Sequence, residues 1–111
     1  MKITANKIEM SRGGSETLTV PLDDETGPVA LVTGDSVKFT VRRTASDTVK
    51  NISKTVTAFT NGLAFITIRP ADTATMEFGW YVYDVEVTFV NGDVKTIVVG
   101  PFIVSEEVTY A

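Results

Sequence analysis

Apolar and polar residues alternate with a period of two along most of this chain, and glycine, proline, asparagine and aspartate interrupt the alternation at short intervals. This period predicts β-strands, because successive side chains of a strand point to opposite faces of the sheet. Only the stretch 70–76, which opens with Pro70, favours a short helical turn. The expected strands span residues 3–10 (interrupted near 6–7), 17–22, 36–43, 49–59, 63–69, 80–90 and 93–104.

Residues 80–104 carry the strongest pattern, two strands joined by Asn91-Gly92. This dipeptide is typical of a two-residue type I′ turn, which would pair residues whose numbers add to 183. Asn61-Gly62 is a second hairpin signal, leading into the strand at 63–69. In the predicted register the core face contains Tyr81, Tyr83, Val85, Val87 and Phe89, opposite Phe102, Gly100, Val98, Thr96 and Val94.

The other face of the same hairpin is more apolar than the solvent side of a sheet requires. Exposed apolar patches of this kind usually mark an interaction surface. Two alternatives remain open: a loop or the N-terminal segment covers the patch, or a β-bulge near Gly100-Pro101 shifts the register. The predicted interaction residues are Trp80, Val82, Ile97, Val99, Pro101 and Ile103, and Phe65 extends the set if Ala64, Ile66 and Ile68 point inward.

Seven short strands in a chain of 111 residues predict an all-β fold, an antiparallel immunoglobulin-like β-sandwich. We expect one domain over residues 1–111, with the short helical turn near 70–76. Pro21 cannot donate a ladder hydrogen bond, so the strand at 17–22 is expected at a sheet edge. A small closed barrel is the alternative architecture.

Composition limits the chemistry that such a domain could carry. The chain has 10 basic and 14 acidic residues, no cysteine and no histidine. It therefore offers no disulfide, no thiolate nucleophile and no imidazole, the commonest general base and transition-metal ligand. A net charge of −4 argues against nucleic-acid binding, which normally requires a basic face. No segment approaches the roughly 20 apolar residues of a membrane helix, so we expect no membrane partner.

Acidic clusters are the remaining candidates for chemistry. Asp23-Asp24-Glu25 lacks the spacing of an EF-hand loop, so a solvated turn is favoured over a calcium site. Asp84 and Glu86 share a strand face about 7 Å apart, a separation that a glycosidase could use. Their expected neighbours are Val99 and Ile97 rather than polar groups. We therefore expect a non-enzymatic protein with no catalytic residues, no metal and no cofactor.

Several short motifs follow one another in a defined order: MSRGG at 10–14, GDSVKFTV at 34–41, ITIRPADT at 66–73, GWYVYDV at 79–85, NGDVKT at 91–96 and FIV at 102–104. In this order the chain resembles the immunoglobulin-like N-terminal domain of baseplate upper proteins and related tail proteins of tailed phages and prophages. The resemblance implies a virion structural role, through contacts with other phage structural proteins or with itself as a homo-oligomer. It also implies synthesis in the host bacterial cytoplasm, with incorporation into the virion when particles are made.

A carbohydrate-binding module is the alternative function. Exposed aromatic rings often stack on sugars, and Trp80, with Tyr110 as a second ring, would provide them. A third hypothesis is a calcium-stabilised domain or metal-dependent enzyme built on Asp23, Asp24 and Glu25.

Overall fold

The computed structural model describes residues 2–4, 7–20, 23–24, 27–28 and 30–106, with the backbone alone at 2–4, 20, 23–24 and 27–28. Strands dominate this part of the chain, so the all-β expectation is confirmed. One helical turn, α1 (Pro70–Thr73), falls inside the predicted stretch 70–76. The strands are β1 (Lys2–Thr4), β2 (Lys7–Ser11), β3 (Glu16–Val20), β4 (Asp23–Asp24), β5 (Gly27–Pro28), β6 (Ser36–Arg42), β7 (Ile52–Val56), β8 (Ala64–Ile68), β9 (Gly79–Thr88) and β10 (Val94–Ser105).

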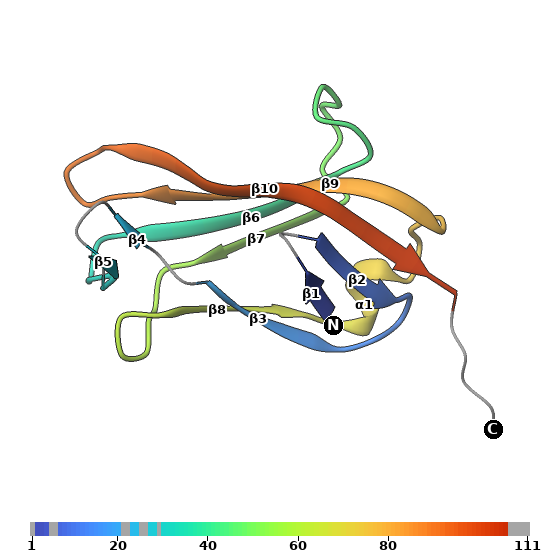
Figure 1. Ribbon diagram of the computed structural model, residues 1–111, viewed down its shortest axis with the longest axis horizontal. Helices are drawn as coiled ribbons and strands as arrows, with labels where there is room; N and C mark the ends of the chain where they lie inside the picture. Colours follow the sequence, from blue (N-terminus) through green and yellow to red (C-terminus); the bar gives the residue numbers. More distant parts are fainter. Residues whose placement is uncertain (1, 5–6, 21–22, 25–26, 29, 107–111) are drawn as a thin grey trace.

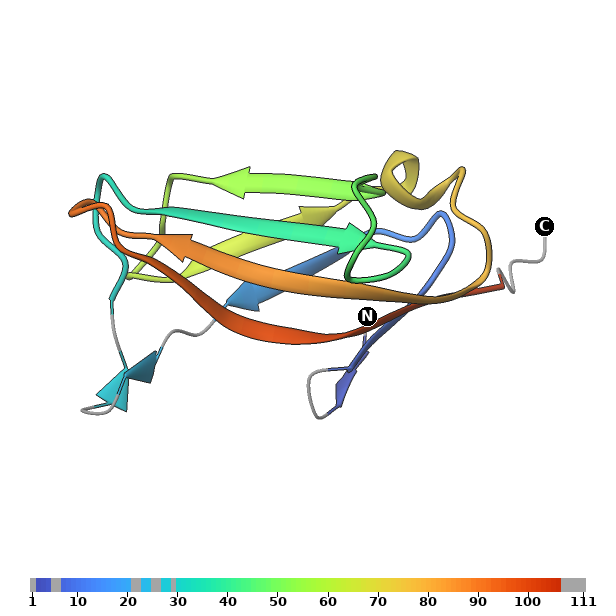
Figure 2. The same cartoon turned by 90° about the horizontal axis from the view of Figure 1, so that it is seen from above.

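A six-stranded sheet in the order β1-β2-β10-β9-β6-β7 forms the larger layer. The pair β3-β8 lies beneath β10, β9, β6 and β7 (Figure 1), and β4-β5 projects at the end opposite α1 (Figure 2). β2 and β10 run parallel, with Ile8 opposite Phe102, so the expectation of a wholly antiparallel fold is wrong. A parallel pair needs a long connection, and here most of the chain separates the two strands.

The core lies between the two layers. β6 contributes Val37, Phe39 and Val41, all with no exposed surface, as its alternation predicts. The Phe39 ring lies 5.7 Å from the Tyr83 ring and 6.2 Å from the Phe102 ring. Each such fully buried side chain contributes about 1.5–3 kcal/mol to stability. β3 and β8 supply the facing side chains Leu18, Ala64, Ile66 and Ile68.

The two Asn-Gly pairs form different turns. Asn61 and Gly62 have φ of 53° and 77°, and Thr60 and Leu63 exchange backbone hydrogen bonds of 3.0 and 2.9 Å. This is the predicted hairpin turn, of type I′. At the second site Gly92 N–H donates to the Phe89 carbonyl (2.8 Å) and Phe89 N–H to the Asp93 carbonyl (2.7 Å). The loop therefore has three residues, 90–92, and the predicted type I′ turn at Asn91-Gly92 is wrong.

The longer loop changes the register of β9 and β10. Val94 pairs with Thr88, one residue away from the predicted partner, and the shift is cancelled by a bulge between Thr96 and Val98. From Val98 to Val104 the predicted pairing is confirmed. A shift of one residue exchanges the two faces of a strand. Val94 and Thr96, predicted to face the core, are consequently exposed.

A candidate interaction face on the large sheet

The outward side chains of β2, β10, β9 and β6 form one surface, which we call the outer face. Its apolar centre follows from the alternation in β9, where odd-numbered residues from Tyr81 to Val87 are buried and even-numbered ones point outward. Trp80 is 62% exposed and Val99 is 61% exposed. Both side chains are therefore accessible to solvent. This centre comprises Trp80, Val82, Val99, Pro101 and Ile103.

Cross-strand pairing makes the apolar centre continuous. Trp80 lies opposite Ile103, which in turn lies opposite Glu9 on β2. Val82 lies opposite Pro101, and Asp84 lies opposite Val99. Directly opposed residues of paired strands have Cβ atoms about 4.5–5.5 Å apart, so these side chains contact one another across the sheet. The structure thus brings together five of the seven predicted interaction residues: Trp80, Val82, Val99, Pro101 and Ile103.

Ile103 is the least accessible of these five, at 9% exposure. It lies on β10, the middle one of three neighbouring strands, between Trp80 on β9 and Glu9 on β2. The centre of the outer face is therefore presented mainly by Trp80, Val82 and Val99, with Val82 half-buried.

Two predicted interaction residues do not belong to this face. Ile97 is the extra residue of the bulge and packs, partly buried, against the core. Phe65 is 40% exposed but lies on β8, whose outward side belongs to the opposite layer (Figure 1). The prediction that Phe65 extends the patch is wrong, because alternation shows whether a side chain points outward but not from which layer. The bulge lies at Ile97 rather than near Gly100-Pro101.

Charged pairs border the apolar centre on both sides. Arg42 lies 3.5 Å from the Asp84 carboxylate, and Lys7 lies 3.7 Å from the Glu9 carboxylate. The Lys7 ammonium is also 5.6 Å from the centre of the Trp80 ring, within the range of a cation–π contact. The outer face therefore has an apolar centre and a polar rim, the arrangement found in protein–protein interfaces.

Lys50, from the loop between β6 and β7, joins the rim beside β6. Hydrogen bonding with Lys38 and the positive charge of Lys38 hold the pKa of Lys50 below its ordinary value, while the charge of Asp84 acts in the opposite direction. Lys38 lies opposite Glu86 on β9. Cations and anions are thus interspersed on this side of the face.

The buried carboxylate of Asp35, near the tip of the β9-β10 hairpin, is not predicted by the sequence pattern. Asp35 is 3% exposed, and its two carboxylate oxygens accept hydrogen bonds from Val32 N–H and Val90 N–H, both at 2.9 Å. The first bond is local, because aspartate side chains often accept from a backbone N–H a few residues away. The second joins segments 55 residues apart, and no pattern in the sequence signals it. Asp35 therefore ties the loop before β6 to the hairpin that carries the outer face.

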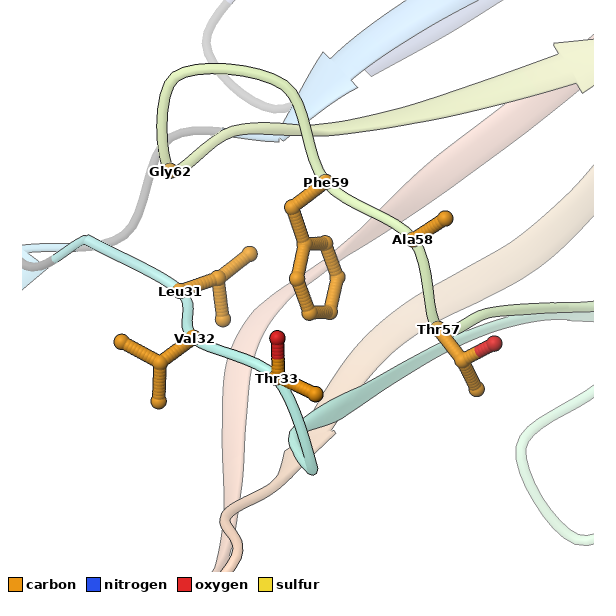
Figure 3. A pocket seen from close by; sticks show the side chains of 7 residues that line it. All are labelled: Leu31, Val32, Thr33, Thr57, Ala58, Phe59 and Gly62. Carbon is orange, nitrogen blue, oxygen red and sulfur yellow. The ribbon is translucent and has the colours of Figure 1, made fainter.

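An open pocket of about 560 Å³ lies between residues 31–33 and the 57–62 loop (Figure 3). The Phe59 side chain lies between the two segments, and Leu31 N–H donates to the Gly62 carbonyl at 3.0 Å. The lining of the pocket has threonine hydroxyls but no ionisable side chain, so the pocket offers no group for acid–base chemistry. The lining residues are Leu31, Val32, Thr33, Thr57, Ala58, Phe59 and Gly62.

No three aspartate or glutamate side chains in the described part of the chain gather closely enough to hold a metal ion. The side chains of Asp23 and Asp24, and all of Glu25 and Tyr110, lie outside what the structure describes. Within residues 2–106, apart from the gaps named above, no helix is long and apolar enough to cross a membrane. Comparisons with protein-family models, curated proteins and solved structures find no match for this chain.

Proposed function

We propose that this protein is a non-enzymatic structural module of a phage or prophage tail or baseplate, and that it acts through protein–protein contacts made by the outer face. The observation that carries the proposal is the exposure of Trp80 and Val99 around half-buried Val82 on a regular sheet. Contiguous apolar surface of this kind is characteristic of interaction sites. The ordered motifs that resemble baseplate upper proteins support the assignment to a virion.

The exposed tryptophan gives the proposed contact an energetic basis. With 62% of its surface exposed out of about 250 Å² for a large aromatic side chain, Trp80 presents roughly 150 Å². At about 25 cal/mol per Å², covering that area contributes about 4 kcal/mol before the costs of association. Tryptophan is also enriched among the residues that dominate binding energy in protein interfaces.

We further propose that the two layers form an immunoglobulin-like sandwich. The connectivity supports this: the second long strand, β3, pairs with β8, while β6, β9 and β10 lie side by side in the other layer. This is how such sandwiches divide their strands between the two sheets. In that architecture the sheet built from β10, β9 and β6 presents one broad outward surface, which is the proposed contact face.

Site-specific photo-crosslinking in the cells that make the protein tests this function. A benzophenone amino acid at Val99 should form a covalent adduct with a protein partner, identified by mass spectrometry. The same group at Phe65 is the matched control, because Phe65 is exposed on the opposite layer. Adducts at Phe65 but not at Val99, or none at either position in cells producing the protein, would contradict the proposal.

Carbohydrate binding is a second candidate, favoured by the exposed Trp80 ring. On a glycan array it predicts a signal that Trp80→Ala abolishes and that Val99→Thr, which keeps the shape of the side chain, leaves in place. An array without any signal would remove this candidate. It would leave the protein-contact proposal unaffected.

A further inference from the structure

We propose that the outer face packs against the outer face of a second copy of this chain, related by two-fold symmetry. This inference rests on the proposed function and specifies its partner. In such a dimer the apolar centres formed by Trp80, Val82 and Val99 cover each other. The same patch serves both subunits, so association closes at two copies.

The distribution of charge favours this partner. The outer face and its rim hold four cationic side chains (Lys7, Lys38, Arg42 and Lys50) and three acidic ones (Glu9, Asp84 and Glu86). Among the other side chains that the structure describes, five are cationic and seven are acidic. The face therefore carries a formal charge of +1 and the other described side chains together −2.

Two copies of an acidic protein repel each other least where they meet through a surface that is nearly neutral. Cations and anions are interspersed on the face. When two copies of the face meet, each copy therefore contacts similar numbers of cations and anions on the other. The ion pairs Arg42–Asp84 and Lys7–Glu9 are already formed within one chain. Neither requires a strongly charged partner. The electrostatics thus favour a second copy over a highly basic or highly acidic protein.

Two features at the edges of the large sheet limit strand addition, the other common route to sheet association, although residues 94–101 of β10 pair only with β9 among the described strands. β1 has only three residues, and short edge strands are a device that limits such pairing. At the opposite edge, β7 places Lys54 on the core side of the sheet, opposite Phe39, where it lies 2.8 Å from the Asp72 carboxylate. An inward-pointing charge protects an edge in the same way.

The dimensions of the face approach those of a standard interface. β9 has ten residues, which at about 3.3 Å per residue span about 33 Å, and four strands at about 4.8 Å span about 19 Å. The flat area is roughly 600 Å², and side-chain relief makes the accessible area larger. A standard interface buries about 800 Å² on each partner.

Sedimentation equilibrium of the purified chain over a range of concentrations tests the proposal. We expect a reversible monomer–dimer equilibrium. Val99→Arg, which puts a charge into the apolar centre at an exposed position, should raise the dissociation constant at least about tenfold, or about 1.4 kcal/mol. Phe65→Arg introduces the same charge on the opposite layer and should change it less than about twofold. The urea midpoint of each variant shows whether the fold is intact.

Trp80→Lys is a second variant on the same face, so the test does not depend on how well Val99→Arg folds. A chain that is monomeric at every concentration overturns the proposal. Open-ended polymers, or equal weakening by Val99→Arg and Phe65→Arg, overturn it as well. A monomeric purified chain together with a Val99 crosslink to a different protein in cells would overturn the second-copy inference alone and leave the proposed function standing.

Discussion

Replacing Asp35 should destabilise the fold far more than replacing the exposed turn residue Asp93. The Asp35 carboxylate is 3% exposed and accepts one hydrogen bond on each oxygen, from Val32 N–H and Val90 N–H. In Asp35→Ala both donors lose their partner, and a part-buried donor without a partner costs about 1–3 kcal/mol. The expected loss is therefore about 2–6 kcal/mol, a large part of the total stability of a domain of this size.

Urea denaturation followed by Trp80 fluorescence measures this loss. Asp35→Asn keeps one acceptor oxygen, so it should lose about half as much as Asp35→Ala. Asp93→Ala is the matched control: Asp93 is an exposed turn residue whose carboxylate contacts only the Asn91 side-chain amide, at 3.2 Å, among the described contacts. It should cost less than about 0.5 kcal/mol. If Asp35→Ala fell within that same range, the role assigned to the buried carboxylate would be refuted.

Three further outcomes are expected from single changes. Burial acts to raise the pKa of Asp72, but the hydrogen bond from Arg69 N–H (2.7 Å) and the contact with Lys54 outweigh it, so the pKa lies below its ordinary value. The stability that Asp72 contributes should thus be present above the unfolded pKa of about 3.9 and be lost as pH falls through the folded pKa. Urea titrations of wild type and Asp72→Asn should differ at pH 7 and converge in strong acid, and a constant difference would contradict the reasoning. Lys54→Val removes the inward-pointing charge that protects the β7 edge, so light scattering should show association through this edge. This association should persist when Lys54→Val is combined with Val99→Arg. Ser53→Val, on the outward side of the same strand, is the control and should show no such effect. Gly62→Ala should destabilise by about 1–3 kcal/mol, because Gly62 has φ of 77° and its added Cβ would lie 2.7 Å from the Ala30 Cβ; Gly92→Ala, with open space around it, should cost less in the same urea assay.

Local patterns predicted the strands well because a period of two depends only on neighbouring residues. The two Asn-Gly turns show the limit of prediction from local patterns. At Asn61-Gly62 the hairpin closes as the dipeptide favours. At Asn91-Gly92 the Val90 N–H bonds to Asp35, and the Asn91 side-chain oxygen accepts the Asp93 N–H at 2.9 Å. These bonds stabilise a three-residue loop, and one of them comes from a residue 55 positions away.

The candidate face was predictable to a similar extent. Alternation places Trp80, Val82 and Val99 on one side of a hairpin without any knowledge of the fold. It cannot locate the bulge at Ile97, because either of two neighbouring apolar residues can face the core. It also cannot assign Phe65 to a layer, since that depends on β8 pairing with β3 instead of with β9.

The accessibility of Trp80 tests the central claim most directly, since it is the only tryptophan in the chain and lies at the centre of the proposed contact. Acrylamide quenching of its fluorescence should be strong in dilute solution, where the indole is 62% exposed. It should fall as the protein concentration rises and the face becomes covered, and in Val99→Arg it should stay strong throughout. Quenching that remains constant across the whole concentration range, and in assemblies isolated from the producing cells, would contradict the claim that this face is where the protein makes its contacts.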